Sequence, residues 1–241
     1  MKKTVLSALI LAAMSGAASA AVTYNFNGSG SGTSFTVNSS PVGSTVNVTA
    51  FSSANTSGSG TFGTATIKQW GSNGWGIQAS GESTNSPAHA ADNAGKDEVF
   101  LHDFGTQVDL LSFAIGWAQE GSGWSTANRA DIDVWVGGPL GALNMTGMCF
   151  TGCASTLAGA GFSKIHYENM AVGSQNEPGL LTGRYVLIGA ETPMDDNASD
   201  YFKLKSVTVE GRVPPNEVPE PSALLLTGLG LMGLAARRRK Q

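Results

Sequence analysis

The fold is decided by residues 98–117, which read EVFLHDFGTQVDLLSFAIGW. Glu98 to Phe104 and Val108 to Trp117 are two runs rich in aromatic and aliphatic residues, and Gly105-Thr106 lies between them. Short runs of this composition, bounded by turn residues, are typical of β-strands. The stretch therefore predicts two strands separated by a turn.

The residues downstream predict further strands. Asp131 to Val136 alternates, with Ile132, Val134 and Val136 on one face, as in a strand that is buried on one side. Tyr185 to Ala190 is a continuous apolar run, which is typical of a central strand buried on both faces. Phe202 to Val209 changes phase, which predicts a bulge near Lys205-Ser206.

The residues upstream are dominated by small polar side chains. Residues 27–66 contain 25 Ser, Thr or Gly residues out of 40, but apolar and polar positions alternate there, which favours short strands with Gly/Ser turns over a disordered linker. Thr61 to Trp70 and Gly74 to Ala79 are expected to pair through a turn at residues 71–73. Only Ser155 to Gly161 and Ile165 to Ala171 are expected to form short helical turns.

The composition supports one all-β domain over residues 21–212. Glycine accounts for 32 of 241 residues, which excludes a long coiled coil, and 41% of the chain is hydrophobic, which excludes a charged disordered protein. Many short strands with Gly-rich turns predict a β-sandwich or jelly roll. From Ala21 to Pro221 there are 18 acidic and 8 basic residues, a net charge of −10. So acidic a body disfavours nucleic-acid binding and is compatible with calcium.

The N-terminal 20 residues have the three parts of a secretory signal peptide. Lys2 and Lys3 precede a short apolar stretch, and a small-x-small site predicts cleavage between Ala20 and Ala21. The sequence therefore predicts an exported protein in an oxidising compartment.

The C-terminal residues also have three parts. Residues 213–221 form a proline-rich stalk that ends in Pro219, Glu220 and Pro221. Residues 222–236 are uncharged and mostly apolar, which predicts a short transmembrane helix. The basic tail, residues 237–241, begins with Arg237, Arg238 and Arg239 and is expected in the cytoplasm.

This arrangement over residues 218–241 resembles the PEP-CTERM sorting domain. The resemblance implies recognition by exosortase, cleavage near Pro219-Glu220-Pro221, transient residence in the inner membrane and delivery to the cell surface or extracellular matrix. Asp92-Asn93, Asp97 to Leu101 and Asp200 to Leu204 also resemble a pattern in exosortase-dependent bacterial surface proteins. That resemblance implies a β-rich surface domain.

Four oxygen-bearing residues, Asp92, Asn93, Asp97 and Glu98, surround Gly95 just before a predicted strand. Hard oxygen ligands in a tight loop suit calcium, although the spacing is not that of an EF-hand. The alternative is an Asx-rich turn with no ion. A second acidic loop, with Asp195, Asp196 and Asp200, is expected to be solvated.

The remaining chemistry-bearing residues give few signals of a reaction. Cys149 and Cys153 are the only two cysteines and are expected to form a disulfide after export. The three histidines lack metal-like spacing, and no Gly-x-Ser-x-Gly elbow is present. Five tryptophans allow either a sugar-stacking platform or ordinary core packing, with Trp117 expected in the core and Trp135 on the polar face of its strand.

These observations predict a non-catalytic bacterial surface or extracellular-matrix protein that exosortase processes, with surface polysaccharide as a candidate partner. The alternative on the same delivery route is a carbohydrate-binding module, and a secreted hydrolase is the third possibility. The sequence names no ligand, final anchor, glycosylation or oligomeric state.

Overall fold

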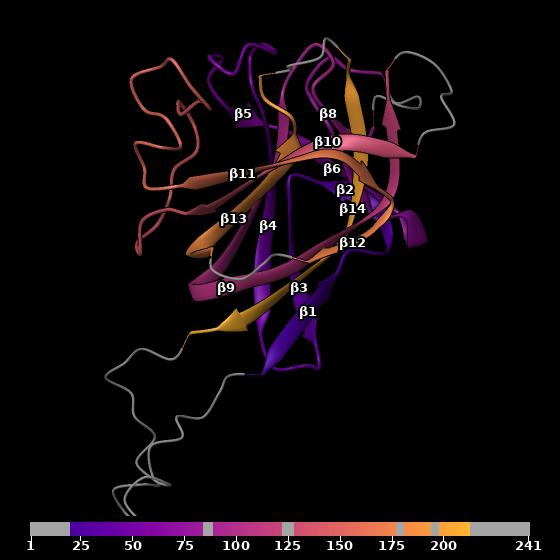
Figure 1. Cartoon of the computed structure of the whole chain (residues 1–241), viewed down its shortest axis with the longest axis vertical. Helices are drawn as coiled ribbons and strands as arrows, with labels where there is room; N and C mark the ends of the chain where they lie inside the picture. Colours follow the sequence, from indigo (N-terminus) through magenta and orange to yellow (C-terminus); the bar gives the residue numbers. More distant parts are fainter. Residues whose placement is uncertain (1–19, 84–88, 122–127, 177–180, 194–197, 213–241) are drawn as a thin grey trace, which may run out of the picture. The chain divides into compact units, whose positions relative to one another are not determined.

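The computed structural model describes residues 20–83, 89–121, 128–176, 181–193 and 198–212 (Figure 1). The predicted stalk, transmembrane helix and basic tail, and all of the predicted signal peptide except Ala20, lie outside these residues. Within the described part, no helix has the length and hydrophobicity needed to span a membrane.

The described chain is nearly all β-structure. Its one short 3₁₀ helix, η2 (Gly71–Asn73), joins two strands. The strands are β1 (Ala21–Asn25), β2 (Ser29–Gly32), β3 (Ser34–Ser40), β4 (Thr45–Ser52), β5 (Gly63–Thr64), β6 (Thr66–Trp70), β7 (Trp75–Gln78), β8 (Ala91–Asp92), β9 (Glu98–Glu120), β10 (Arg129–Gly137), β11 (Ser163–Ala171), β12 (Gly173–Asn176), β13 (Thr182–Ala190) and β14 (Asp200–Gly211). The all-β prediction is confirmed.

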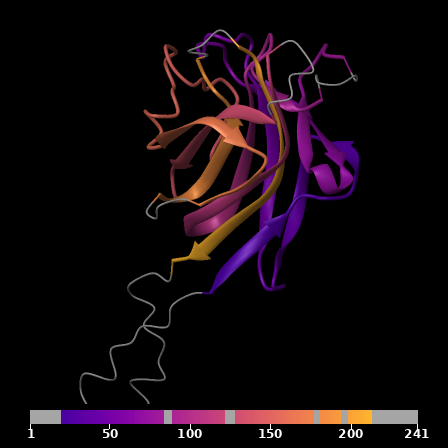
Figure 2. The same cartoon turned by 45° about the vertical axis from the view of Figure 1, so that its right-hand side comes forward.

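All strand pairs belong to one large antiparallel sheet. Its order is β11-β10-β13-β9-β4-β3-β1-β14-β7-β6-β2, with β12, β5 and β8 attached to β9, β4 and β14. Strand β9 also pairs with β14, so the hydrogen-bonded path β9-β4-β3-β1-β14 returns to β9. The sequence predicted a sandwich or jelly roll. The described strands instead form one continuous sheet, whose two halves face each other across the first core (Figure 2).

The longest strand, β9, spans both runs that were expected to be separate strands, so that prediction is wrong. Gly105 does adopt a left-handed backbone, with φ of 73°, but the chain does not reverse there. Strand β13 pairs with Val99–Asp103 on one side of this point and with Val108–Asp109 on the other. The same partner strand therefore holds both runs in one direction.

Two hydrophobic cores lie on opposite faces of β9, β10 and β13. Along β13, Val186 and Ile188 point into the first core, whereas Tyr185 and Leu187 point into the second. The predicted central strand buried on both faces is therefore confirmed. The first core joins both halves of the sheet through Tyr24, Val48, Ile67, Ile77, Phe100, Val134, Ile188 and Val207.

The second core is covered by the connection between β10 and β11. Trp135, expected on a polar face, is only 4% exposed because its ring packs 4.8 Å from that of Phe150. The predicted disulfide between Cys149 and Cys153 closes a short loop in this connection. The other members are Phe51, Phe62, Val99, Leu101, Met145, Met148, Leu157, Phe162, Tyr185 and Leu187.

Several local predictions can be compared directly with the strands. The Gly/Ser-rich segment forms β2 to β5, β6 and β7 pair through η2, and β14 has register shifts on both sides of Leu204, near the predicted bulge. The helical turn expected at Ile165–Ala171 is wrong, because those residues belong to β11 and pair with β10. Their local sequence is outweighed by hydrogen bonding along the edge of the sheet.

The hairpin of β6 and β7 approaches the rest of the sheet closely at Gly76. A Cβ atom at this position lies 1.9 Å from the carbonyl oxygen of His89, which is backbone and has no rotamer to change. We predict that Gly76→Ala lowers the free energy of unfolding by about 1–3 kcal/mol, the usual cost of overpacking. Urea unfolding of the purified protein measures this change.

The matched control is Gly63→Ala in β5, where an added Cβ meets no atom within 4 Å. It should leave the free energy of unfolding nearly unchanged. Equal stabilities of the two variants would contradict the close approach at Gly76.

Candidate functional site

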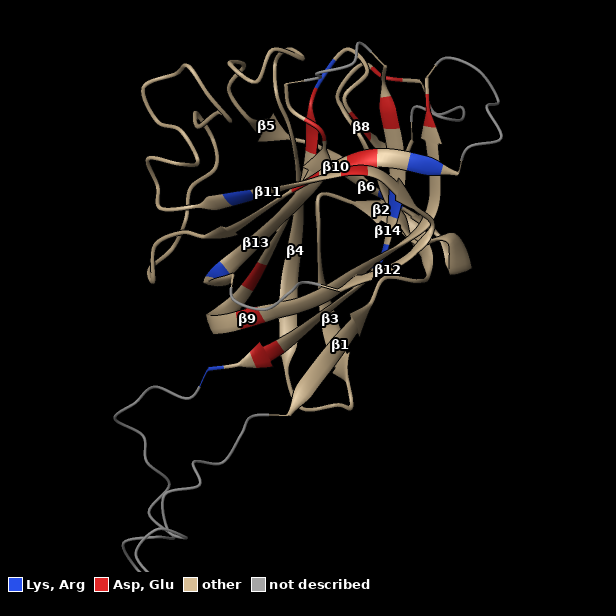
Figure 3. Cartoon of the chain, viewed as in Figure 1, with Lys and Arg blue, Asp and Glu red and all other residues tan. Residues whose placement is uncertain are grey.

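Buried acidic side chains gather at one end of the sheet, which we call the acidic end (Figure 3). Antiparallel pairing brings the starts of β9, β10 and β14 together with the end of β13, because Gly189 pairs with Val99, and Ile132 with Ala190. Acidic residues occupy these strand ends and the loops beside them. The fully buried ones are Asp92, Asp97, Glu98, Asp131, Asp133, Glu191 and Asp200.

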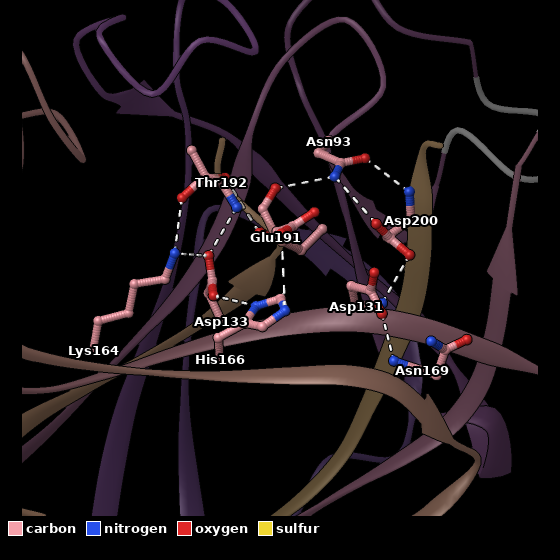
Figure 4. A network of polar contacts seen from close by, with 10 residues as sticks. Asn93, Asp131, Asp133, Lys164, His166, Asn169, Glu191, Thr192 and Asp200 are labelled. Atoms are coloured by element: carbon pink, nitrogen blue, oxygen red, sulfur yellow. Dashed lines mark hydrogen bonds and ion pairs between the residues drawn. The ribbon is translucent and has the colours of Figure 1, made fainter. Parts of the chain in front are cut away.

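Three of these residues form the one group of acidic side chains in the described part with metal-like geometry. Asp131, Glu191 and Asp200 each offer a carboxylate oxygen, and these oxygens lie within 4.8 Å of one another. The backbone N–H of Asp131 donates to Asp200 Oδ1 at 2.7 Å, and that of Asn169 donates to Asp131 Oδ1 (Figure 4). Converging carboxylate oxygens are the ligands that calcium prefers.

Asn93 ties this group to the loop before β9. Its Nδ2 donates to the Glu191 carbonyl oxygen at 3.0 Å and to Asp200 Oδ2 at 3.3 Å, and its Oδ1 accepts from the Asp200 N–H at 2.7 Å. Both polar atoms of the Asn93 side chain are thus engaged in positioning Glu191 and Asp200. Asn93 therefore acts as a positioning residue here.

Asp133 has its own cationic partners beside this group. Lys164 Nζ lies 2.6 Å from Asp133 Oδ2, and His166 Nδ1 lies 3.0 Å from Oδ1. Burial lowers the pKa of His166, but the hydrogen bond and charge of Asp133 outweigh it and raise that pKa. His166 Nε2 has no hydrogen-bond partner among the described residues, and its nearest acidic atom is Glu191 Oε1 at 3.8 Å. A nucleophile bound to this His–Asp pair is therefore absent from the described part.

The four predicted calcium ligands face different surroundings. Asp92 and Glu98 stay together, since the Asp92 N–H donates to Glu98 Oε2 at 3.2 Å. Asp97 instead accepts from the Gly58 N–H at 3.2 Å and from Ser53 Oγ at 3.4 Å. Within the described chain, Asp92, Asp97 and Glu98 do not bring one oxygen each within 4.8 Å of one another.

The pKa values of the three carboxyl groups in this loop are raised above those of ordinary Asp and Glu side chains. Burial, with the nearby charges of Glu82 and Asp97, raises the pKa of Asp92 to about 8. Burial likewise raises the pKa of Asp97 to about 7, and that of Glu98 well above its ordinary value. Asp97 Oδ1 and Glu98 Oε1 have no hydrogen-bond partner among the residues described. These buried oxygens favour either a proton or a cation.

Asp131 and Glu191 were not predicted as ligands from the sequence, and the prediction for Asp200 is wrong. Asp200 was expected in a solvated loop but is fully buried, because it opens β14 opposite Glu120 of β9; Asp195 and Asp196 lie outside the described residues. The available signal was position: Glu191 directly follows β13, and Asp131 lies near the start of β10. Their convergence required the strand order.

A second candidate site lies on β2 and β6, far along the sheet from β10. Trp70 is 41% exposed, whereas Trp75 and Trp135 are buried and Trp117 is half-buried. Trp70 borders a shallow pocket of about 260 Å³, which we call the Trp70 pocket. Its lining residues are Gly30, Ser31, Lys68, Gln69, Trp70 and His89. Trp124 lies outside the described residues.

The comparison with known families decides what the C-terminal residues are. Residues 217–240 match the model of the PEP-CTERM protein-sorting motif. The chain carries a PEP-CTERM sorting motif. This confirms the resemblance seen in the sequence and indicates exosortase-dependent export of a substrate that passes the membrane. No curated protein and no solved structure matches the chain.

The raised pKa values at the acidic end predict a loss of stability on raising the pH without added metal. Carboxyl groups with pKa values of about 7 and 8 stay protonated in the folded state when they are already ionised in the unfolded chain. The stability linked to these groups is fully present below the ordinary carboxyl pKa, where both the folded and unfolded states are protonated. It is lost as the pH rises through the pKa values of the folded state, because ionisation then places charges in the buried site. We expect the free energy of unfolding in chelator to fall between about pH 6.5 and about pH 8.

Urea unfolding at the two pH values measures this slope, and Asp97→Asn should reduce it. Buried His102 does not titrate in this window, because burial lowers its pKa to about 4. His166 does titrate there, because Asp133 raises its pKa, so the difference in slope between the natural protein and Asp97→Asn is what isolates the carboxyl contribution. A free energy of unfolding that rises with pH across the window would contradict the assignment.

Proposed function

We propose that this protein is a non-catalytic component of the bacterial cell surface or extracellular matrix that exosortase processes at its PEP-CTERM tail. The observation that carries the proposal is the sorting motif at residues 217–240. The signal-like residues 1–20 at the other end of the chain support export through the same membrane.

The body is compatible with removal of both ends. Strand β1 begins at Ala21, directly after the predicted signal cleavage site, and pairs with β14 from Ala21↔Glu210 to Asn25↔Ser206. The first and last strands therefore lie side by side in the sheet (Figure 1). Cleavage after Ala20 and near Pro219-Glu220-Pro221 leaves every described strand intact.

The arrangement of the histidines supports the non-catalytic part of the proposal. His102 is fully buried and bonds to the Val186 carbonyl oxygen, so it is not available to a substrate. His166 pairs with Asp133, which itself binds Lys164. A secreted hydrolase is therefore the least supported of the three functions.

The second candidate is a carbohydrate-binding module on the same sorting system. The observation that favours it is Trp70, which is the most exposed tryptophan among the described residues and borders a pocket with polar side chains. Aromatic rings with a few placed polar groups are typical of ligand pockets.

We also propose that the acidic end binds calcium after export, with Asp131, Glu191 and Asp200 as the ligands. Support comes from the convergence of their carboxylate oxygens within 4.8 Å of one another and from the burial of all three residues. A divalent cation offsets the cost of burying carboxylates close together.

Thermal melting of the exported protein tests the calcium proposal. At about 10 mM calcium, roughly a hundredfold excess over the Kd of a tight extracellular module, binding stabilises the folded state by about 2.7 kcal/mol and raises the midpoint above that in chelator. Asp200→Asn should abolish the rise, and Asp97→Asn should preserve it. An unchanged midpoint contradicts calcium binding, and a rise lost only in Asp97→Asn contradicts this choice of ligands.

Intact-mass analysis of the protein from its producing cells tests the sorting proposal. We expect a mature chain that begins at Ala21 and lacks Arg237, Arg238 and Arg239, because both cleavages occur outside the folded body. The matched control replaces Pro219, Glu220 and Pro221 by alanine, which should retain the tail. A natural protein that keeps its arginines would refute exosortase processing and leave a plain C-terminal anchor.

A further inference from the structure

Two side chains, His89 and Lys203, contact the Trp70 indole. Its ring lies 4.1 Å from that of His89, and Lys203 Nζ lies 4.7 Å from the Trp70 centroid and 5.0 Å from that of Trp117. Lys203 Nζ also lies 3.2 Å from His89 Nε2. The cation–π contact with Lys203 and the tilted ring contact with His89 position the indole while leaving 41% of the residue exposed. A fixed, exposed ring loses little conformational entropy when a ligand stacks on it.

The charge of the Trp70 pocket differs from that of the body. Its ionisable lining groups are Lys68 and His89, and no carboxylate lines it. Lys68 makes no ion pair with the described residues, unlike Lys164, Arg184 and Arg212, which each bind an aspartate. The body as a whole carries ten net negative charges, but basic groups and no carboxylate line this pocket. The pocket is therefore the part of the surface that suits an anionic ligand.

We propose that this surface binds an acidic polysaccharide, with Trp70 stacking on a sugar ring and Lys68 pairing with its carboxylate. The proposal rests on the carbohydrate-binding candidate above and names its ligand class and residues. The pyranose ring presents apolar C–H groups to the indole. The uronic carboxylate supplies the negative partner that the Lys68 ammonium does not find among the described residues.

Affinity electrophoresis of the purified exported protein tests this inference with alginate, polygalacturonate and hyaluronate, each compared with neutral dextran. We expect retardation by at least one uronic-acid polymer and none by dextran, with weaker binding at high salt. Trp70→Ala should weaken binding by about tenfold or more, which corresponds to roughly 1.4 kcal/mol. Lys68→Gln should weaken it and reduce its salt dependence.

The matched controls are Leu140→Ala and Lys96→Gln, which change an exposed apolar residue and a half-buried lysine that do not line the pocket. They should bind as the natural protein does. Trp70→Phe keeps an aromatic ring and should retain part of the affinity, which separates lost stacking from lost folding.

The proposal is overturned if none of the three acidic polymers binds, if dextran binds equally well, or if Trp70→Ala binds like the natural protein. Sorting is read out independently, because Trp70→Ala should still be cleaved at both ends and reach the same location. Loss of binding with normal processing leaves the sorting proposal intact, and missing processing with normal binding leaves the polysaccharide site intact.

Discussion

Continuous hydrogen bonding along β9 is the constraint on which the rest of the structure depends. Backbone N–H and C=O groups buried in a sheet must be paired, and β9 meets this requirement over 23 residues with four different partners. Its first part pairs with β4 and β13, and its second part pairs with β12 and β14. Because β9 belongs to both halves of the sheet, it fixes how they face each other and encloses the first core.

The second core follows from the same geometry. The face of β9, β10 and β13 that turns away from the first core is also apolar, since Leu101, Trp135 and Leu187 alternate with first-core residues. Burial of this face requires a cover, and the long connection between β10 and β11 provides it with Met145, Met148, Phe150 and Leu157. The Cys149–Cys153 disulfide restrains this cover, which is held by turn hydrogen bonds and contains none of the named strands.

The two candidate sites have opposite charge. At the acidic end, carboxylates are buried at converging strand ends, where Asp133 is offset by Lys164 and His166. The Trp70 pocket has the opposite character, with Lys68 at its edge and Lys203 behind its indole. A cation bound at the acidic end would lower the electrostatic self-repulsion of the body, whereas an acidic polymer at the Trp70 pocket would depend on the local positive charge of Lys68. Both ligands fit the exported setting that the sorting motif indicates.

The sequence by itself was enough to identify the sorting motif of the protein and its all-β fold class. The sorting tail is a contiguous motif, and β-strands, the bulge in β14 and the disulfide depend on alternation or close spacing, so each can be seen in neighbouring residues. Tertiary structure alone decided that Gly105 bends one strand instead of ending it, because the deciding partner, β13, lies some 80 residues away in the chain. It also left Asp92 beside Glu98 but gave Asp97 and Asn93 other partners, and it brought Asp131, Glu191 and Asp200 together. Metal-like geometry and the exposure of Trp70 arise from strand order, which depends on contacts distant in sequence, and local pattern does not carry that information.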